Sequence, residues 1–190
     1  WSFPVAEVEL ATGLVINEIM QNPAVVSDAA GEWIEITNIS DETISLYNLI
    51  LRDNGGEQHV ISENVDVAPD SYIVLGSEND PALNGGVNVN YEYSGITLSN
   101  LWDEVILEHP TGVILDSVAY DNGITFPDEN GKSMMLLDPT LDNSLGENWA
   151  VADVVFGAGD YGTPGSINFS GDCGDSPGDM NGDNTYNVLD

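Results

Sequence analysis

Short apolar runs that alternate with turn-forming clusters limit the fold of this chain more than any other feature. The runs are rich in Val, Ile, Leu and aromatic residues, and no long stretch repeats its apolar residues with helical spacing. Asn-Gly steps such as Asn54-Gly55 and Asn122-Gly123 supply the positive φ angles that tight hairpins need. We therefore expect strands at residues 14–20, 32–38, 44–51, 59–61, 72–76, 90–93, 104–108, 112–120, 133–137 and 148–151.

The run at residues 32–38 shows how such strands should lie. Ile34 and Ile36 fall on one side, whereas Trp33 and Glu35 fall on the other, which predicts a half-buried strand. Strands and turns at this density are typical of a β-sandwich with Greek-key connections. The expected fold class is all-β.

The charge balance excludes several classes of partner. The chain carries 33 Asp and Glu residues against one arginine, Arg52, and one lysine, Lys132, for a net charge of −31. Nucleic acids and anionic membrane surfaces select cationic side chains, so neither is an expected partner. No apolar run approaches the roughly 20 residues that span a bilayer, so membrane insertion is not expected either. Copies of such a chain repel one another unless salt screens the charge or cations neutralise it. An equal explanation of the excess of acidic residues is general solubility in concentrated salt.

The beginning of the sequence differs from its middle. Residues 1–10 alternate as a further strand would, with Ala6, Val8 and Leu10 on one side and Glu7 and Glu9 on the other. The start at Trp1, without Met, indicates a processed product whose targeting segment has been removed. We therefore expect a secreted protein, at the cell surface or outside the cell.

The end of the sequence also departs from the strand pattern. Residues 157–178 are rich in Gly, Asp, Ser and Pro, which predicts a loop or linker. The expected division is an extra strand at residues 1–12, a sandwich domain at 13–169, and a linker with a terminal loop at 170–190.

Three pieces of the chain resemble the bacterial lamin tail domain. Leu14-Val-Ile-Asn-Glu-Ile-Met20, followed by Asn22-Pro23, is similar to the opening strand of that family. The second and third strands of the family are matched by Gly31-Glu-Trp-Ile-Glu-Ile-Thr-Asn38 and Leu46-Tyr-Asn-Leu-Ile-Leu51, which resemble them. The closing motif of the family resembles Gly162-Thr-Pro-Gly-Ser-Ile-Asn168. The resemblance implies an immunoglobulin-like sandwich that serves as an accessory, adhesive or assembly module and has no catalytic residues. In bacteria such modules often accompany secreted enzymes.

Motifs of enzymes are missing from the sequence. It has no Gly-x-Ser-x-Gly elbow, no His-Glu-x-x-His pair and no glycine loop for phosphates. His59 and His109 lie beside apolar residues at strand edges, where we expect structural roles. Glu18, Glu32 and Glu35 occupy strand positions, so we expect them to accept backbone hydrogen bonds or face solvent, with a metal site among them as the alternative. The chain is thus expected not to be an enzyme.

The last twelve residues carry the sharpest chemical signal. A calcium ion takes about six to eight oxygen ligands, and a twelve-residue loop can wrap around it. Loop positions 1, 3, 5, 7, 9 and 12 fall on Asp179, Asn181, Asp183, Thr185 (through its backbone carbonyl), Asn187 and Asp190. Because these ligands are all oxygen, they predict Ca²⁺ rather than a soft or transition metal. The alternative is a chance match in a tail rich in Asp and Asn.

This loop resembles that of a type I dockerin repeat, in which Asp commonly closes the site. It departs from the EF-hand pattern at Asn184, where Gly is usual, but Asn tolerates the left-handed conformation. The sequence reaches its last residue at the final ligand, Asp190, before the helix that follows such a loop.

Two functions fit these features. The first is a non-catalytic secreted structural module, a calcium-dependent surface or filament subunit that associates through strand pairing and metal. Its partners would be copies of itself or other extracellular proteins. The alternative is an accessory adhesion or docking module of a larger secreted enzyme or of a cohesin–dockerin complex. We favour the first, because the extra strand and the loop both suit contacts with neighbours.

Overall fold

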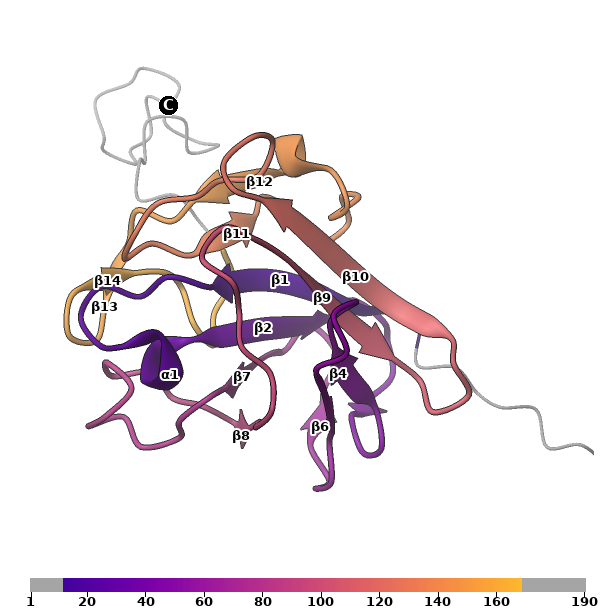
Figure 1. Ribbon diagram of the computed structural model, residues 1–190. Helices are drawn as coiled ribbons and strands as arrows, with labels where there is room; N and C mark the ends of the chain where they lie inside the picture. The colour runs from indigo at the N-terminus through magenta and orange to yellow at the C-terminus, as the bar shows by residue number, and fades with distance from the viewer. Residues whose placement is uncertain (1–11, 169–190) are drawn as a thin grey trace, which may run out of the picture.

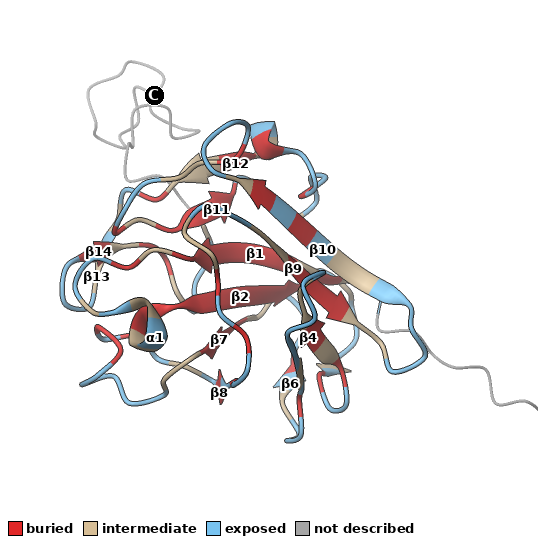
Figure 2. Ribbon diagram, in the orientation of Figure 1, coloured by how far each residue is buried: buried red, intermediate tan, exposed pale blue. Residues whose placement is uncertain are grey.

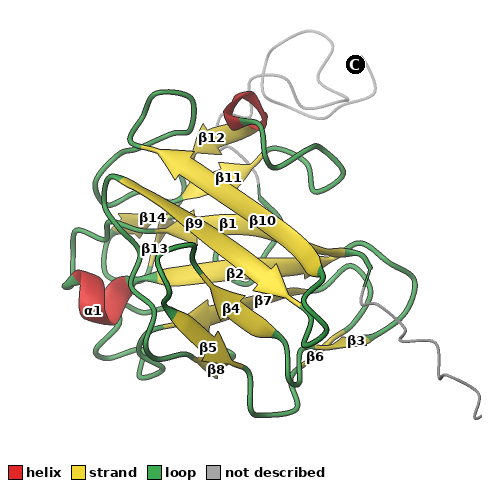
Figure 3. Cartoon of the chain, turned by 45° about the vertical axis from the view of Figure 1, so that its right-hand side comes forward, coloured by secondary structure: helices red, strands yellow, loops and turns green. Residues whose placement is uncertain are grey.

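Strands dominate the part of the chain that the computed structural model describes, residues 12–168 (Figures 1 and 3). The larger sheet has six strands in the order β12-β11-β1-β2-β7-β8: Trp149–Val151, Met134–Leu136, Leu14–Met20, Trp33–Asn38, Tyr72–Gly76 and Tyr91–Glu92. The smaller sheet has four strands in the order β10-β9-β4-β5: Ile114–Asp121, Trp102–Glu108, Ile50–Arg52 and Gln58–Val60. Two short ladders pair β13 with β14 (Val155–Phe156, Asp160–Tyr161) and β3 with β6 (Ile44–Ser45, Asp66–Val67). The helical pieces are α1 at Asp28–Gly31 and a 3-10 turn at Gly146–Asn148.

Side chains from the two larger sheets meet in one apolar core. Ile16 and Ile36 come from the six-stranded sheet, and Leu51, Leu107 and Val118 come from the four-stranded sheet. Each of these side chains is at most 1% exposed, and burying one of this size stabilises the fold by about 1.5–3 kcal/mol. The predicted all-β, immunoglobulin-like sandwich is therefore confirmed.

The second face of the six-stranded sheet is also covered, which the alternation in β2 did not predict. All six residues of β2 are buried, and Figure 2 shows β1 and β2 buried along most of their lengths. Trp33 packs there with Met20, Val74 and Val87, and its ring meets that of Phe156 edge-on at a centroid distance of 6.0 Å. The prediction of a half-buried strand was wrong because the chain after β12 returns across this face.

Most predicted strands occur within a few residues of their expected bounds. The ranges of β1 and β7 match the predictions, but the expected strand at residues 44–51 is two strands, β3 and β4. The break comes at Asn48, whose φ of 66° ends an extended run. The loop expected at residues 157–178 was also wrong in part, because β14 lies inside it.

Neither helical piece within residues 12–168 has the length and apolar character needed to cross a bilayer.

Two isoleucines provide a matched test of the core. Ile36 is 0% exposed and Ile124 is 81% exposed. Replacing Ile36 by Ala should lower the free energy of unfolding by about 2–5 kcal/mol, because it removes buried methyl groups and leaves a cavity. Replacing Ile124 by Ala should change it by less than about 0.5 kcal/mol. Chemical denaturation of both variants measures the difference, and equal losses would contradict the assigned core.

Candidate functional site

The predicted calcium ligands Asp179, Asn181, Asp183, Thr185, Asn187 and Asp190 lie outside the described residues, so the calcium site stays a prediction. Within residues 12–168, no three His, Cys, Asp or Glu side chains are grouped so that they could bind a metal ion. In this part of the chain, the most unusual chemistry belongs instead to two buried carboxyl groups.

Glu18 and Glu35, here called the carboxyl pair, lie directly opposite each other on β1 and β2. Both residues are 0% exposed. A β-bulge between Ile16 and Glu18 shifts the register, so Ile16 points into the main core while Glu18 lies on the second face. The bulge therefore places two acidic side chains of neighbouring strands side by side, away from water.

The C-terminal part of the described chain supplies hydrogen-bond donors to Glu18. The backbone N–H of Thr163 donates to Oε1 at 2.9 Å, and the Thr163 hydroxyl donates to Oε2 at 2.9 Å. The hydroxyl of Ser133, the residue before β11, also donates to Oε1. Gly162 permits this close approach, because a Cβ there would lie 2.9 Å from Glu18 Oε1.

Glu35 is bound in the same manner. The backbone N–H of Gly165 donates to Oε2 at 2.6 Å, and Gly165 has a φ of +83°, a conformation that favours glycine. On the other side, the amide group of Asn17 contacts Oε1 at 2.7 Å. The prediction of backbone donors is confirmed for both glutamates, whereas exposure to solvent is excluded.

Residues 162–168, here called the closing segment, are thus fixed across the second face of the sheet. The amide of Asn168 adds two bonds, to the carbonyl oxygens of Asn17 at 2.9 Å and Leu136 at 2.8 Å. Through these hydrogen bonds the closing segment is joined to β1, β2 and β11. This gives the Gly-Thr-Pro-Gly-Ser-Ile-Asn motif a structural role.

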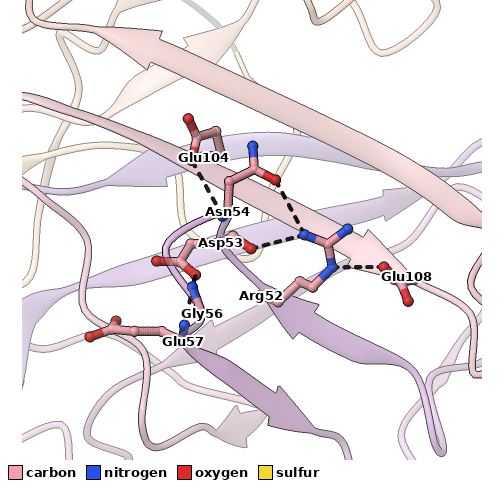
Figure 4. A network of polar contacts seen from close by, with 7 residues as sticks. All are labelled: Arg52, Asp53, Asn54, Gly56, Glu57, Glu104 and Glu108. Atoms are coloured by element: carbon pink, nitrogen blue, oxygen red, sulfur yellow. Dashed lines mark hydrogen bonds and ion pairs between the residues drawn. The ribbon is translucent and has the colours of Figure 1, made fainter.

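Neither the lysine nor the arginine side chain neutralises the carboxyl pair, because each forms an ion pair elsewhere. Arg52 contacts Glu108 across β4 and β9 at 2.7 Å, and it also donates to the Asp53 carbonyl at 2.9 Å (Figure 4). Lys132 contacts Glu129 at 2.7 Å. Protons and neutral donors must therefore stabilise the pair.

The pKa values follow from this environment. Burial, together with the nearby Glu18, raises the pKa of Glu35 to about 8, and burial also raises the pKa of Glu18. Glu35 is therefore mainly protonated at neutral pH. The contact with Asn17 suits this state as well, because the carboxyl O–H can donate to Oδ1 if the amide is turned over.

A third buried glutamate, Glu32, lies away from the pair at the start of β2. Its Oε2 accepts a hydrogen bond from the backbone N–H of Leu98 at 3.0 Å. Burial raises the pKa of Glu32 to about 7, and the nearby charges of Asp28 and Asp103 add to the shift. The backbone donor expected for this residue is therefore also confirmed.

Both histidines are held by local contacts. His59 Nε2 lies 2.8 Å from the Tyr91 hydroxyl, which connects β5 with β8. His109 Nδ1 lies 2.7 Å from the Thr111 hydroxyl within one turn. These contacts agree with the structural roles expected from the sequence.

Comparisons with known proteins identify the family. The model of the lamin tail domain matches residues 8–122, more than half of the chain, so the chain belongs to this family. The match ends at the close of β10, and the sandwich continues beyond it to the closing segment. No curated protein sequence matches the chain. Lamin tail domains are immunoglobulin-like and generally non-catalytic.

The buried glutamates predict an unusual dependence of stability on pH. Glu35 keeps its proton in the folded state up to about pH 8, whereas its pKa in the unfolded chain is near 4.5. The folded state therefore binds more protons between these values, and the free energy of unfolding should fall as the pH rises from 5 to 8. Each such group contributes up to about 1.4 kcal/mol per pH unit.

Urea denaturation at several pH values measures this slope. The variant Glu35→Gln should flatten it, because its side chain cannot ionise. The variant Glu63→Gln removes one charge from an exposed residue and serves as the control. If both variants keep the slope of the parent protein, Glu35 is not the source of the dependence.

Proposed function

We propose that this lamin tail domain is a non-catalytic structural subunit that assembles outside the cell through calcium ions and strand pairing. The observation that carries the proposal is that both basic side chains are already paired within one copy. Arg52 is bound to Glu108 and Lys132 to Glu129, in a chain with 33 acidic residues.

This arrangement leaves two copies with repulsive surfaces. Exposed carboxylates such as those of Asp41, Glu63 and Asp80 have no free Lys or Arg side chain to meet on a neighbour. Opposing carboxylates raise the free energy of contact unless salt screens them or a cation lies between them. Calcium suits this task, because it binds carboxylate oxygens and reaches millimolar concentrations outside cells.

The terminal loop supplies a specific place for the ion. The spacing of a calcium loop is found in Asp179, Asn181, Asp183, Thr185, Asn187 and Asp190. The loop follows the closing segment after about ten residues of sequence. The alternating residues 6–10 lie outside the described residues, and their predicted extra strand is the second proposed means of association.

Light scattering and electron microscopy in millimolar calcium, with and without a chelator, test this function. We expect assemblies in calcium and dissociation on chelation, because the metal offsets the repulsion. Sodium chloride at matched ionic strength separates screening from binding and should not restore the assemblies. A protein that stays monomeric in millimolar calcium would refute the proposal.

A pair of double variants tests the loop itself. Asp179→Asn with Asp183→Asn removes two predicted ligand charges, whereas Asp172→Asn with Asp175→Asn removes the same charge outside the loop. The first should raise the calcium concentration needed for half-maximal assembly by about tenfold or more, and the second should leave it nearly unchanged. Equal effects would show that net charge alone matters.

The second candidate is an accessory or docking module. The closing Asp190 favours it, because type I dockerin loops commonly end in Asp. Titration with a cohesin in calcium discriminates the two functions: a one-to-one complex without self-association supports docking, and self-association without a complex supports the structural subunit.

A further inference from the structure

The outer strands of the two large sheets differ greatly in length. The six-stranded sheet ends at β12, with three residues, and at β8, with two. The four-stranded sheet ends at β5, with three residues, and at β10, with eight. Only β10, among the described edge strands, is long enough to pair with an added strand of five residues.

The outer edge of β10 is protected at its start but less so further along. Within residues 12–168 its partner is β9, and Figure 3 shows β10 at the margin of the four-stranded sheet. A β-bulge between Ile114 and Asp116 and the half-buried Asp116 carboxylate discourage pairing at the start of the strand, but residues 117–121 contain neither Lys nor Pro. Its outward N–H and C=O groups can therefore receive another chain.

The two faces of β10 match the pattern of residues 6–10. Val118 and Tyr120 point into the core, whereas Ser117 and Ala119 are exposed on the outer face. A strand added beside β10 would continue both faces. Its apolar side chains, Ala6, Val8 and Leu10, would extend the core side, and Glu7 and Glu9 would face water.

Apolar surface lies close to the same edge. Asn143 donates from Nδ2 to Asp116 Oδ2 on β10 at 2.7 Å, so its loop lies against this strand. Two leucines flank Asn143 in that loop, Leu141 and Leu145, and they are 40% and 45% exposed. They offer partners to the apolar side chains of an added strand.

The entry of the chain into β1 favours a second copy as the donor. Ile39 N donates to Gly13 O at 2.8 Å, and a Cβ on Gly13 would lie 2.8 Å from Ser40 Cβ, so Gly13 is held on the β2 side of β1. β10 lies on the opposite side, where Ile16 N donates to Asp116 Oδ2 at 2.6 Å. At the start of the described chain, Gly13 is therefore bonded on the side of β1 away from β10.

We infer that β10 is the acceptor strand to which residues 6–10 of a second copy add, extending the four-stranded sheet by one strand. The inference rests on the proposed self-association and names the surface that carries it. The added segment spans about 17 Å, and the eight residues of β10 span about 27 Å. When the donor's own β10 accepts a third copy, repetition yields a ring or a linear array, whereas exchange between two copies closes a dimer.

Disulfide cross-linking between two different single-cysteine chains tests the assignment. In a Cys173→Ser background, one chain carries Glu9→Cys and the other carries Ser117→Cys, because both positions would lie on the water-facing side of the extended sheet. A disulfide between them can form only between copies, since each chain holds one thiol. The control replaces Ser117→Cys by Val60→Cys on the three-residue edge β5, where Val60 is 47% exposed.

The β10 thiol should give about tenfold more mixed disulfide than the β5 thiol, because bridged Cα atoms must lie within roughly 7 Å. Equal yields, or assembly in calcium without the β10 cross-link, would overturn the β10 assignment while leaving self-association intact. A rapid disulfide within one chain carrying both Glu9→Cys and Ser117→Cys, with none between chains, would place the segment on its own β10 and also overturn it. Failure of the Cys173→Ser protein to assemble in calcium would overturn both proposals.

Discussion

The fold buries two carboxyl groups that no Lys or Arg side chain neutralises. Both basic side chains are used near the surface, so the interior has only protons, hydroxyls, amides and backbone N–H groups with which to stabilise Glu18 and Glu35. An isolated buried carboxylate would cost far more than a domain of this size can offset, and raised pKa values and neutral donors remove most of that cost. The way in which the closing segment folds over the sheet follows from this constraint.

Buried acidic groups connect distant parts of the chain throughout the sandwich. Glu18 accepts from Thr163, 145 residues away, and Glu35 accepts from Gly165, 130 residues away. Asp116 joins β10 to Ile16, and Asp160 accepts from the backbone of Ala24 at 3.1 Å. Each of these contacts uses a backbone N–H that a salt bridge would not satisfy. In this fold, hydrogen bonds from backbone N–H groups to acidic side chains thus hold distant segments together, as ion pairs do in chains with more Lys and Arg.

The sequence predicted the strands well, since turn chemistry and apolar runs are local signals. It could not predict the carboxyl pair, because strict alternation in β1 places Ile16 and Glu18 on the same face, and only the bulge separates them. The sequence also could not predict that the second face of the six-stranded sheet is covered, because the closing segment that covers it lies far along the chain. Acidic residues on otherwise apolar strands, on the side of Trp33, were the available signal. The calcium ligands Asp179 to Asp190 lie outside the described residues and stay predictions.

A proton on Glu35, rather than a Lys or Arg side chain, neutralises the buried pair. Carbon-13 NMR of the glutamate side-chain carboxyl groups across a pH titration tests it most directly, with Glu35→Gln to assign the resonance. Glu35 should titrate near pH 8 in the folded protein. A midpoint near the ordinary value of 4.5 would contradict it, because the carboxylate would then be stable in the interior without its proton.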